Sequence, residues 1–515
     1  MHRSIRNSPS CRTLTFGVAL TAALLAPIAA ADLISWTNAT GDHQWNTPAN
    51  WDLGRKPNGT DFVLISAPGS DAVVVHGGLD ACGTLVSSHP VQIEAGANFH
   101  VYGSASFNGG LTILLAGGSP LLMNHGTITV GTFGHFYGGI VLQDAGTTFT
   151  FQANCATTFY APFSFIKGFV FNHGTMHLQA PVTMTAFNSN ETINFTNQLD
   201  GWIYFDNGSA GLDAASLSGP SYFINYGNCN FAAGGFVNSK LATYNVGTYY
   251  VLSGLLNIGN FQSIDGSGTL LEGSYYLYNG ARIQQSTNAI HTIDSDAFVY
   301  LSGKDGLGVS SFMDGIYAAD TIYGVLYVDG GAELTLAPDF FGTVKNHGKV
   351  GVGPGGKMTV NGGYTCYADG THNIAVADAT PTGIGVFQTY TSMLLSGTLQ
   401  VDFYDDMLPT VQGASFVVAN LVDPQSAFIS GAFAQAVVLP ANGYDTHVEY
   451  GTGVVKLVVG SACAADLDGS GTVDGGDLGL LLGGWGVAGP ADLDGNGVVD
   501  GGDLGLLLGA WGGCP

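Results

Sequence analysis

Two acidic stretches near the C-terminus carry carboxylates at a regular spacing that suits the binding of a hard cation. They read ADLDGSGTVDGGDLGLLLGGWG from residue 465 and ADLDGNGVVDGGDLGLLLGAWG from residue 491, an offset of 26 residues. Calcium is held by roughly six to eight oxygen atoms, and a short loop can supply them from alternate residues. The repetition of the same spacing, in phase, indicates two equivalent metal sites.

Each loop offers oxygen ligands at positions 1, 3, 5, 7, 9 and 12, with a glycine at position 6 for the sharp turn. These positions are Asp466, Asp468, Ser470, Thr472, Asp474 and Asp477 in the first loop, and Asp492, Asp494, Asn496, Val498, Asp500 and Asp503 in the second. Position 7 binds through its backbone carbonyl, so Val498 is acceptable there. Asp instead of Glu at position 12 shortens the reach of the last carboxylate and predicts weaker binding or a shell completed by water. We therefore predict two bound calcium ions.

The charge of this region predicts that its folding depends on the metal. Eight carboxylates crowd the two loops, and the chain has no lysine or arginine after Lys456. Without ions these carboxylates repel one another, so the bound metal would supply part of the folding free energy.

The pair of loops, each followed by the apolar segment DLGLLLG, resembles the type I dockerin. In that family each loop leads into one helix, and the two loop-helix repeats pack antiparallel around an approximate twofold axis. The resemblance implies that two leucine clusters form the facing surfaces, namely Leu478, Leu480, Leu481 and Leu482 with Leu504, Leu506, Leu507 and Leu508. It also implies a cohesin-like partner or another cell-surface protein. Recognition in the family usually uses hydroxyl side chains at loop positions 10 and 11, where this chain has Gly475, Gly476, Gly501 and Gly502.

Cysteine usage fits an exported protein. Cys463 and Cys514 bracket the acidic module, so a disulfide that closes it is plausible in an oxidising compartment. Four other cysteines are scattered singly without CxxC spacing, and we expect them to be buried thiols: Cys82, Cys155, Cys229 and Cys366.

The long middle of the chain is typical of an all-β fold. Short alternating runs such as TITVGTF and KMTVNGG are separated by Gly and Asn turns, and 78 of the 515 residues are glycine. No amphipathic helical period occurs before residue 460. We expect the many Tyr and Phe residues to form stacked ladders in the core rather than a sugar-binding platform.

One turn recurs as Asn, a variable residue and Gly before a strand. It begins at Asn124, Asn172, Asn225, Asn245 and Asn346, with separations of 48, 53, 20 and 101 residues, close to multiples of roughly 20 to 25. Such a period predicts a mainly β, right-handed parallel β-helix in which Asn side chains pair along the stack, followed by a small all-α calcium-binding module. The variable position holds His125, His173 and His347 but also Tyr226 and Val246, so we expect bulk rather than imidazole chemistry to matter there.

The two ends of the β region resemble bacterial secreted repeat proteins of the autotransporter-passenger type. The opening segment places Trp36, Trp45 and Trp51 before Gly54 and Pro57, and a closing segment follows near the end. We predict a signal peptide at 1–31, parallel β-helix repeats at 32–383, a β-helix closing segment at 384–460 and the dockerin-like module at 461–515.

The N-terminal segment and the net charge limit the cellular location and the partners. Basic residues, an apolar stretch and a small-residue site between Met1 and Ala31 predict a secretory signal peptide, and hence a secreted, extracellular or cell-surface protein. The formal net charge of −25 disfavours nucleic acid as a partner. No later apolar run is long enough to span a membrane.

Two functions follow from these features. The preferred one is a non-catalytic β-helix protein with a calcium-binding module for attachment or assembly. The alternative is a dockerin-bearing polysaccharide lyase or glycoside hydrolase, in which case a polysaccharide would be the partner. Asp294 and Asp296 alternate on a predicted strand and are the carboxylates to test, although a solvated strand face is the favoured explanation for them. No set of catalytic residues is recognisable in the sequence.

Overall fold

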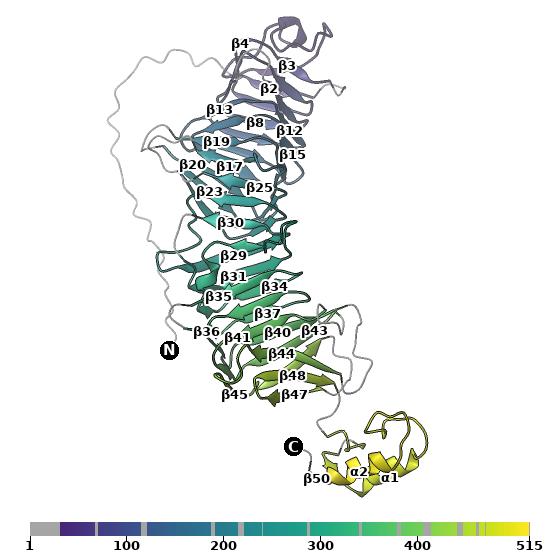
Figure 1. The fold of residues 1–515 in the computed structure, drawn as a ribbon. Coiled ribbons are helices and arrows are strands. Elements are labelled where there is room, and N and C mark those ends of the chain that lie inside the picture. The colour runs from purple at the N-terminus through teal and green to yellow at the C-terminus, as the bar shows by residue number, and fades with distance from the viewer. Residues whose placement is uncertain are drawn as a thin grey trace, which may run out of the picture.

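The structure, a computed structural model, describes residues 31–66, 69, 71–114, 121–186, 191–214, 221–238, 240–285, 289–338, 342–377, 383–404, 414–439, 446–459, 463–468 and 470–513. Residues 1–30 of the predicted signal peptide lie outside these ranges. The described residues between β1 (Leu33–Ser35) and β46 (Gln435–Leu439) form a parallel β-solenoid of about 13 turns (Figure 1). The mainly β, parallel solenoid predicted from the sequence is therefore confirmed.

Each coil contributes strands to three faces. The first face contains β1 (Leu33–Ser35), β2 (Phe62–Ile65), β5 (Thr84–Ser87), β8 (Ser104–Phe107), β11 (Thr127–Val130), β14 (Thr148–Phe151), β17 (Gly168–Asn172), β20 (Ile193–Asn197), β23 (Ser221–Asn225) and β26 (Leu241–Asn245), followed by β33 (Thr321–Ile322), β36 (Thr343–Asn346), β39 (Gly363–Cys366), β42 (Met393–Leu395) and β45 (Ile429–Gly431). The second face contains β3 (Val73–Val75), β6 (Val91–Ile93), β9 (Leu111–Ile113), β12 (Phe133–Phe136), β15 (Ala156–Phe159), β18 (Thr175–Leu178), β21 (Trp202–Phe205), β24 (Asn228–Phe231), β27 (Thr248–Val251), β29 (Thr269–Tyr278), β31 (Thr292–Ser302), β34 (Val325–Asp329), β37 (Lys349–Val352), β40 (Thr371–Val376), β43 (Thr398–Phe403) and β46 (Gln435–Leu439).

The third face completes the coil. It contains β4 (Gly78–Cys82), β7 (Ala97–Val101), β10 (Leu121–Asn124), β13 (Gly139–Gln143), β16 (Phe163–Ile166), β19 (Val182–Thr185), β22 (Gly211–Ala214), β25 (Gly234–Val237), β28 (Leu255–Ile258), β30 (Arg282–Gln285) and β32 (Phe312–Met313), followed by β35 (Glu333–Leu336), β38 (Lys357–Val360), β41 (Val386–Thr389) and β44 (Ser415–Leu421). Short 3-10 turns occur at η1 (Pro48–Asn50) and η2 (Ile316–Ala318). The long strand β31 joins two faces, because its start pairs with β33 and its end with β34.

The register shows how regular the coils are. Thr127 pairs with Thr148, and Thr148 with Phe169, so two successive coils have the same length. Other coils are shorter, as between Val73 and Val91, or much longer, as between Val182 and Leu212. The repeat length of roughly 20 to 25 residues predicted from the Asn turns is thus an average. Insertions at the corners change the length of a coil, while the strands stay paired in register.

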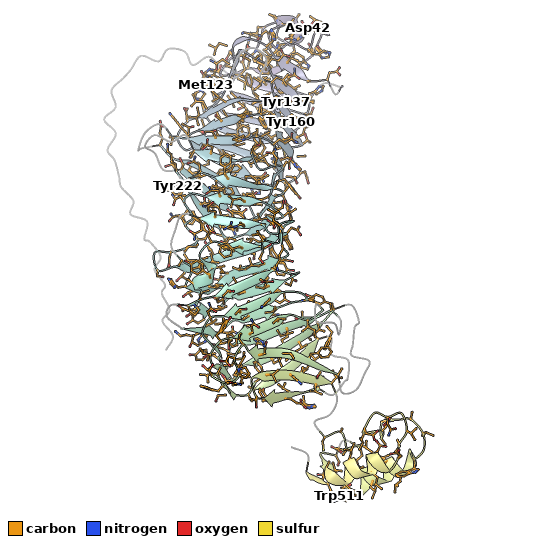
Figure 2. All side chains as sticks on the ribbon, viewed as in Figure 1. Asp42, Met123, Tyr137, Tyr160, Tyr222 and Trp511 are labelled. Atoms are coloured by element: carbon orange, nitrogen blue, oxygen red, sulfur yellow. The ribbon has the colours of Figure 1, made fainter. Side chains whose placement is uncertain are left out.

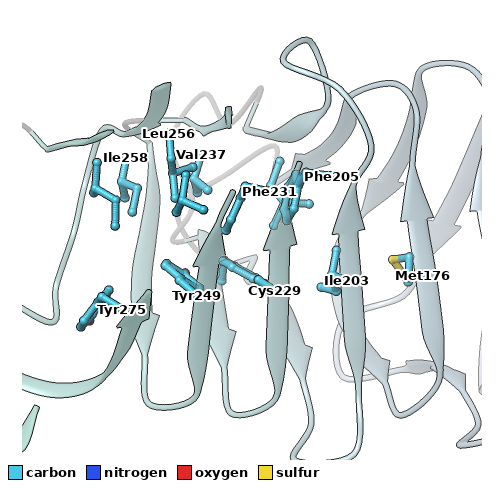
Figure 3. Close-up of a cluster of buried hydrophobic side chains, with 14 of the residues drawn as sticks. Met176, Ile203, Phe205, Cys229, Phe231, Val237, Tyr249, Leu256, Ile258 and Tyr275 are labelled. Atoms are coloured by element: carbon cyan, nitrogen blue, oxygen red, sulfur yellow. The ribbon is translucent and has the colours of Figure 1, made fainter. Parts of the chain in front are cut away.

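The core is built from side chains that repeat from coil to coil. On the second face Met176, Ile203, Cys229, Tyr249 and Tyr275 stand in one inward column, each paired in register with the next (Figure 3). All five are at most 1% exposed, because alternate strand residues point inward. The four cysteines expected to be buried thiols are indeed free and buried.

The aromatic side chains divide between the inside and the outside. Phe136 and Phe159 stack in the core with ring centroids 4.7 Å apart, as predicted for a core ladder. Tyr137 and Tyr160, labelled in Figure 2, stack on the outside at 4.5 Å and are 41% and 39% exposed. Many tyrosines follow this second pattern. The expectation that the aromatic ladders are internal therefore holds for the majority of the phenylalanines but fails for many of the tyrosines.

A buried asparagine ladder runs along the corner between the first and second faces. The side-chain amide of Asn172 donates to Asn197 at 2.8 Å, Asn197 to Asn225 at 2.8 Å, and Asn225 to Asn245 at 2.7 Å. All four are completely buried. The pairing of Asn side chains expected from the recurring turn is present, and it includes Asn197, which lies in a different local sequence.

Asn124 occupies another corner. It ends β10 on the third face, and its amide donates to Gln143, not to a ladder asparagine, at 3.1 Å. The same Asn turn therefore occurs at two different corners of the coil. For this reason the separation between Asn124 and Asn172 is not a whole number of coils.

Both ends of the solenoid are covered. At the start Trp51 packs edge-on against Trp36 at 4.9 Å and Trp45 at 4.8 Å, and all three are at most 4% exposed. At the end β44 pairs antiparallel with β48 (Val454–Val459), which pairs antiparallel with β47 (Thr446–Gly451). Parallel pairing nevertheless continues past residue 384 into β43 and β46. None of the helices in the described residues is long and apolar enough to cross a membrane.

Candidate functional site

Two short helices begin directly after the acidic loops. They are α1 (Gly475–Gly483) and α2 (Gly501–Gly509). Each starts with a capping box: the side chain of Asp474 accepts from the amide of Gly476, and Asp477 accepts from the amide of Asp474. Asp500 and Asp503 repeat the arrangement in α2. Local capping chemistry thus fixes where each loop ends.

The structure brings three carboxylates together in each loop. Asp466, Asp468 and Asp477 each offer an oxygen within 4.8 Å of the others. In the second loop the same is true of Asp492, Asp494 and Asp503. These are positions 1, 3 and 12 of the predicted loops, so each triad could hold a metal ion.

Backbone amides hold the carboxylates of the triads in place. In the first loop Asp466 accepts from the amides of Ser470 at 3.0 Å and Gly471 at 2.7 Å, while Asp477 accepts from Asp468 at 3.0 Å. The amide of Asp474 is the largest cause that lowers the pKa of Asp477, which is completely buried. This carboxyl is therefore held as an anion inside the module.

The second loop repeats this network. Asp492 accepts from Asn496 at 3.1 Å and from Gly497 at 2.7 Å. The amide of Asp500 is likewise the largest cause that lowers the pKa of Asp503. Gly471 and Gly497 have φ of 83° and 93°, the left-handed turn predicted for the glycine at position 6.

The remaining predicted ligands lie outside the triads. Asp474 and Asp500, at position 9, cap the helices instead. The Ser470 hydroxyl donates to the carbonyl of Thr472 at 3.1 Å, and the Asn496 amide donates to Asp494 at 3.1 Å. Val498 is 42% exposed. The donor set of each triad is all oxygen and anionic, which fits a hard cation such as calcium.

The glycine at position 11 has a steric role that the sequence did not reveal. A Cβ on Gly476 would stand 2.6 Å from Oδ2 of Asp468, and a Cβ on Gly502 would stand 2.6 Å from Oδ2 of Asp494. Nothing lies within 4 Å of such an atom on Gly475 or Gly501. The departure from hydroxyl residues at position 11 therefore makes room for the ligand at position 3.

The two repeats share one small core. Its completely buried members are Val473, Leu481, Val499 and Leu507. Leu478 and Leu504 pack partly against them. The other leucines expected to form the facing surfaces do not, because Leu480, Leu482, Leu506 and Leu508 are 49–53% exposed.

Each repeat also binds the chain that follows the helix of the other. β49 (Thr472–Val473) pairs with β50 (Gly512–Gly513). In the second loop Val499 corresponds to Val473. Its carbonyl accepts a hydrogen bond at 2.9 Å from the amide of Gly486, which follows α1. Cys463 forms a disulfide, and Cys514, its predicted partner, lies outside the described residues.

The histidines of the recurring turn sit on the outside of the solenoid and pair with aspartates. Nδ1 of His125 lies 2.7 Å from Asp144, and His173 and His347 make equivalent contacts with Asp200 and Asp369 at 2.9 and 3.0 Å. In each case the partner follows in the next coil. These contacts link successive coils, and among the described residues none of them belongs to a group of three ligand atoms close enough to hold one metal ion.

The carboxylates singled out for catalysis do not form a pair. Asp294 accepts from the amide and hydroxyl of Ser295, next to it in the chain. Asp296 instead pairs in register with Glu272 on β29. No family model matches the chain, and no curated protein matches it.

Proposed function

We propose that the protein is a secreted or cell-surface, non-catalytic β-solenoid whose C-terminal module binds two calcium ions and serves in attachment or assembly. The observation that carries the proposal is the same acidic triad, formed twice at an offset of 26 residues. A pair of anionic, oxygen-only sites in a segment without lysine or arginine calls for bound cations.

The residues of each loop have distinct roles in this proposal. Asp466, Asp468 and Asp477, with their counterparts in the second loop, hold the ion directly. Ser470 or Asn496, the carbonyl of Thr472 or Val498, and Asp474 or Asp500 complete the shell directly or through water. Bound calcium neutralises the triads, which lets the shared core of the two repeats close.

The exposed apolar side chains of the module support a docking role of the kind found in dockerins. Leu480, Leu482 and Trp485 are 47–53% exposed, and Leu506, Leu508 and Trp511 repeat them. A hollow of about 310 Å³ between the repeats is lined by Leu467, Leu480, Val487, Pro490 and Val499 among others. Because exposed apolar clusters commonly mark protein contacts, a cohesin-like or other cell-surface protein is the proposed partner.

Calorimetry on the full chain tests the metal sites. Chelator-treated protein should bind two calcium ions with dissociation constants on the order of 10⁻⁵ to 10⁻³ M, the range of weak sensor and extracellular sites. Replacing both Asp466 and Asp468 with alanine should abolish one site and weaken the other, since each repeat completes the core of its partner. Replacing Asp265 and Asp423, which lie in solenoid turns, should leave both sites intact. A single ion or none in the unmodified protein would refute the proposal.

One observation favours the alternative function as a polysaccharide lyase or glycoside hydrolase. Glu272 and Asp296 are neighbours on β29 and β31, and burial together with Asp296 raises the pKa of Glu272. A carboxyl with a raised pKa beside a second carboxylate is the arrangement of a general acid. We expect no turnover of pectin, alginate or similar polymers; release of reducing ends or unsaturated products, lost in Glu272→Gln, would establish the enzyme instead.

A further inference from the structure

A column of outward tyrosines on the second face ends at a glycine. Tyr276, Tyr300 and Tyr327 are paired in register, and their ring centroids lie 5.6 and 5.7 Å apart. The next residue in the column is Gly351, and the ring of Tyr327 occupies the place where its Cβ would stand. Tyr327 therefore lies against the sheet and extends along the solenoid axis.

A buried carboxylate stands beside this column. Oδ2 of Asp329 accepts the hydroxyl of Tyr300 at 2.6 Å. Oδ1 of Asp329 is buried and has no hydrogen-bond partner, and the residue is 7% exposed. Leaving such an oxygen unpaired is unfavourable, so the position favours a ligand that brings a hydrogen-bond donor.

A second carboxylate lies further along the same face. Asp402 on β43 accepts from the side-chain amides of Asn373 at 2.9 Å and Gln400 at 2.8 Å. The side-chain hydroxyls of Tyr404 and Tyr327 are hydrogen-bonded to each other, and Tyr404 is 40% exposed. Burial raises the pKa of Tyr327, and the Tyr404 hydroxyl, Asp329 and Asp402 raise it further. The two tyrosine hydroxyls thus lie within the field of both carboxylates.

Within the described residues no ion pair neutralises the two carboxylates of this cluster. Among the described residues neither Asp329 nor Asp402 forms an ion pair, and Lys349, the nearest lysine in register, lies beside Val325 and Thr371. Carboxylates next to tyrosine rings favour an ammonium group, which can donate hydrogen bonds to the oxygens and lie against a ring.

The geometry of the face favours a saccharide amine over a peptide. β34, β37 and β40 are each paired on both sides, so a peptide has no free strand edge to extend at this place. Outward rings continue along the stack from Trp202 through Tyr250 to Tyr276, with centroid separations of 6.1 and 5.1 Å. Such a strip runs parallel to the axis and suits a linear chain of sugar rings.

We propose that the cluster of Asp329, Asp402, Tyr327 and Tyr404 binds a protonated amine of an amino-sugar polymer that lies along the second face. The amine takes the place of the Tyr404 hydroxyl and donates to Asp329, while Asp402, three strands further along the same face, attracts the next part of the polymer by its charge. This site belongs to the solenoid and is independent of the calcium module.

Titration calorimetry of the full-length protein with a glucosamine hexasaccharide, at a mildly acidic pH where its amines are protonated, tests the site. We expect saturable binding that weakens with salt and falls at least about ten-fold in Asp329→Asn, since a hydrogen bond to a charged group is lost. Asp402→Asn should weaken binding similarly and serves as a second variant if the first fails to fold. The control is Asp144→Asn, an exposed carboxylate beside His125 at another corner of the solenoid, which should bind like the unmodified protein.

Several outcomes would overturn the proposal. Absence of binding would do so, as would equal binding of the fully N-acetylated hexasaccharide, which has no ammonium groups. Binding that survives both Asp329→Asn and Asp402→Asn would show that the net charge of −25 alone attracts the oligomer. An oligolysine peptide that binds as tightly, and loses affinity in Asp329→Asn, would assign the site to peptides instead.

Discussion

At the scale of single residues, the two neighbouring glycines of each loop differ in what surrounds them. Gly476 faces Oδ2 of Asp468, whereas Gly475 faces open space. The spacing of the aspartates was enough to predict positions 1, 3 and 12 of each triad. It did not predict the capping role of Asp474 or the steric role of Gly476, because both depend on how the helix start folds back on the loop.

This difference gives a matched pair of variants. Gly476→Ala should push the Asp468 carboxylate away and weaken calcium binding at the first site by about ten-fold, or ~1.4 kcal/mol. Gly475→Ala should leave the affinity unchanged and favour the helix by up to about 1 kcal/mol. Calcium titration of both variants decides the point; an equal loss in the two would mean that helix propensity, not the ligand at position 3, is responsible.

His372 is a residue whose burial makes the solenoid sensitive to acid. It lies on β40, donates from Nε2 to the carbonyl of Val418 at 2.9 Å and accepts the hydroxyl of Tyr364 at Nδ1, 3.2 Å away. Burial lowers its pKa from 6.5 to about 4. The hydrogen bond from Tyr364 requires an unprotonated Nδ1, so protonation of the ring would break it.

The consequence is a loss of stability between pH 6.5 and about 4. In this window the unfolded chain binds a proton that the folded chain excludes, so stability is full above the upper limit and falls as the pH drops, by up to about 3 kcal/mol. Urea midpoints should show this slope, and His372→Gln should flatten it. Substitution of the outward-facing His135 by glutamine should leave the slope unchanged, and an unchanged slope in His372→Gln would contradict the assignment.

At the scale of elements, the asparagine ladder ties the first face to the second. The recurring Asn turn made the solenoid predictable, because one residue type at one corner implies a stack. It could not distinguish corners, since Asn124 uses the same turn between two other faces. Nor could it identify Asn197, whose turn has a longer stretch before its glycine, Gln198 to Asp200, than the recurring pattern.

Removing one rung should destabilise the coils around it. Asn225→Ala takes away the acceptor of Asn197 and the donor to Asn245, leaving buried amide groups unpaired at a cost of about 2–3 kcal/mol. Asn230→Ala, on the outward side of β24, should cost less than about 0.5 kcal/mol. Thermal or urea unfolding compares the two, and similar losses would show that the ladder contributes little.

At the scale of the whole molecule, two separate cores suggest two separate responses to calcium removal. The buried residues of the solenoid form one cluster, and those around the acidic loops form another. We expect chelator to expose the region after residue 463 to proteolysis while the solenoid stays protected, because only the C-terminal triads need an ion. Mass spectrometry of the digest gives the cleavage sites. Equal protection of both regions in chelator would contradict metal-dependent folding of the module.

The asparagine ladder also bears on the order in which the chain folds. Each buried amide finds its acceptor only when the next coil has docked, so a growing stack always ends in one unpaired group. Partly formed stacks therefore carry a penalty that completing the next coil removes, which favours zipper-like propagation from an early nucleus. Along this corner two paired asparagines are enough for a nucleus, and each further coil that carries a ladder asparagine is then held in register by its hydrogen bond to the previous one.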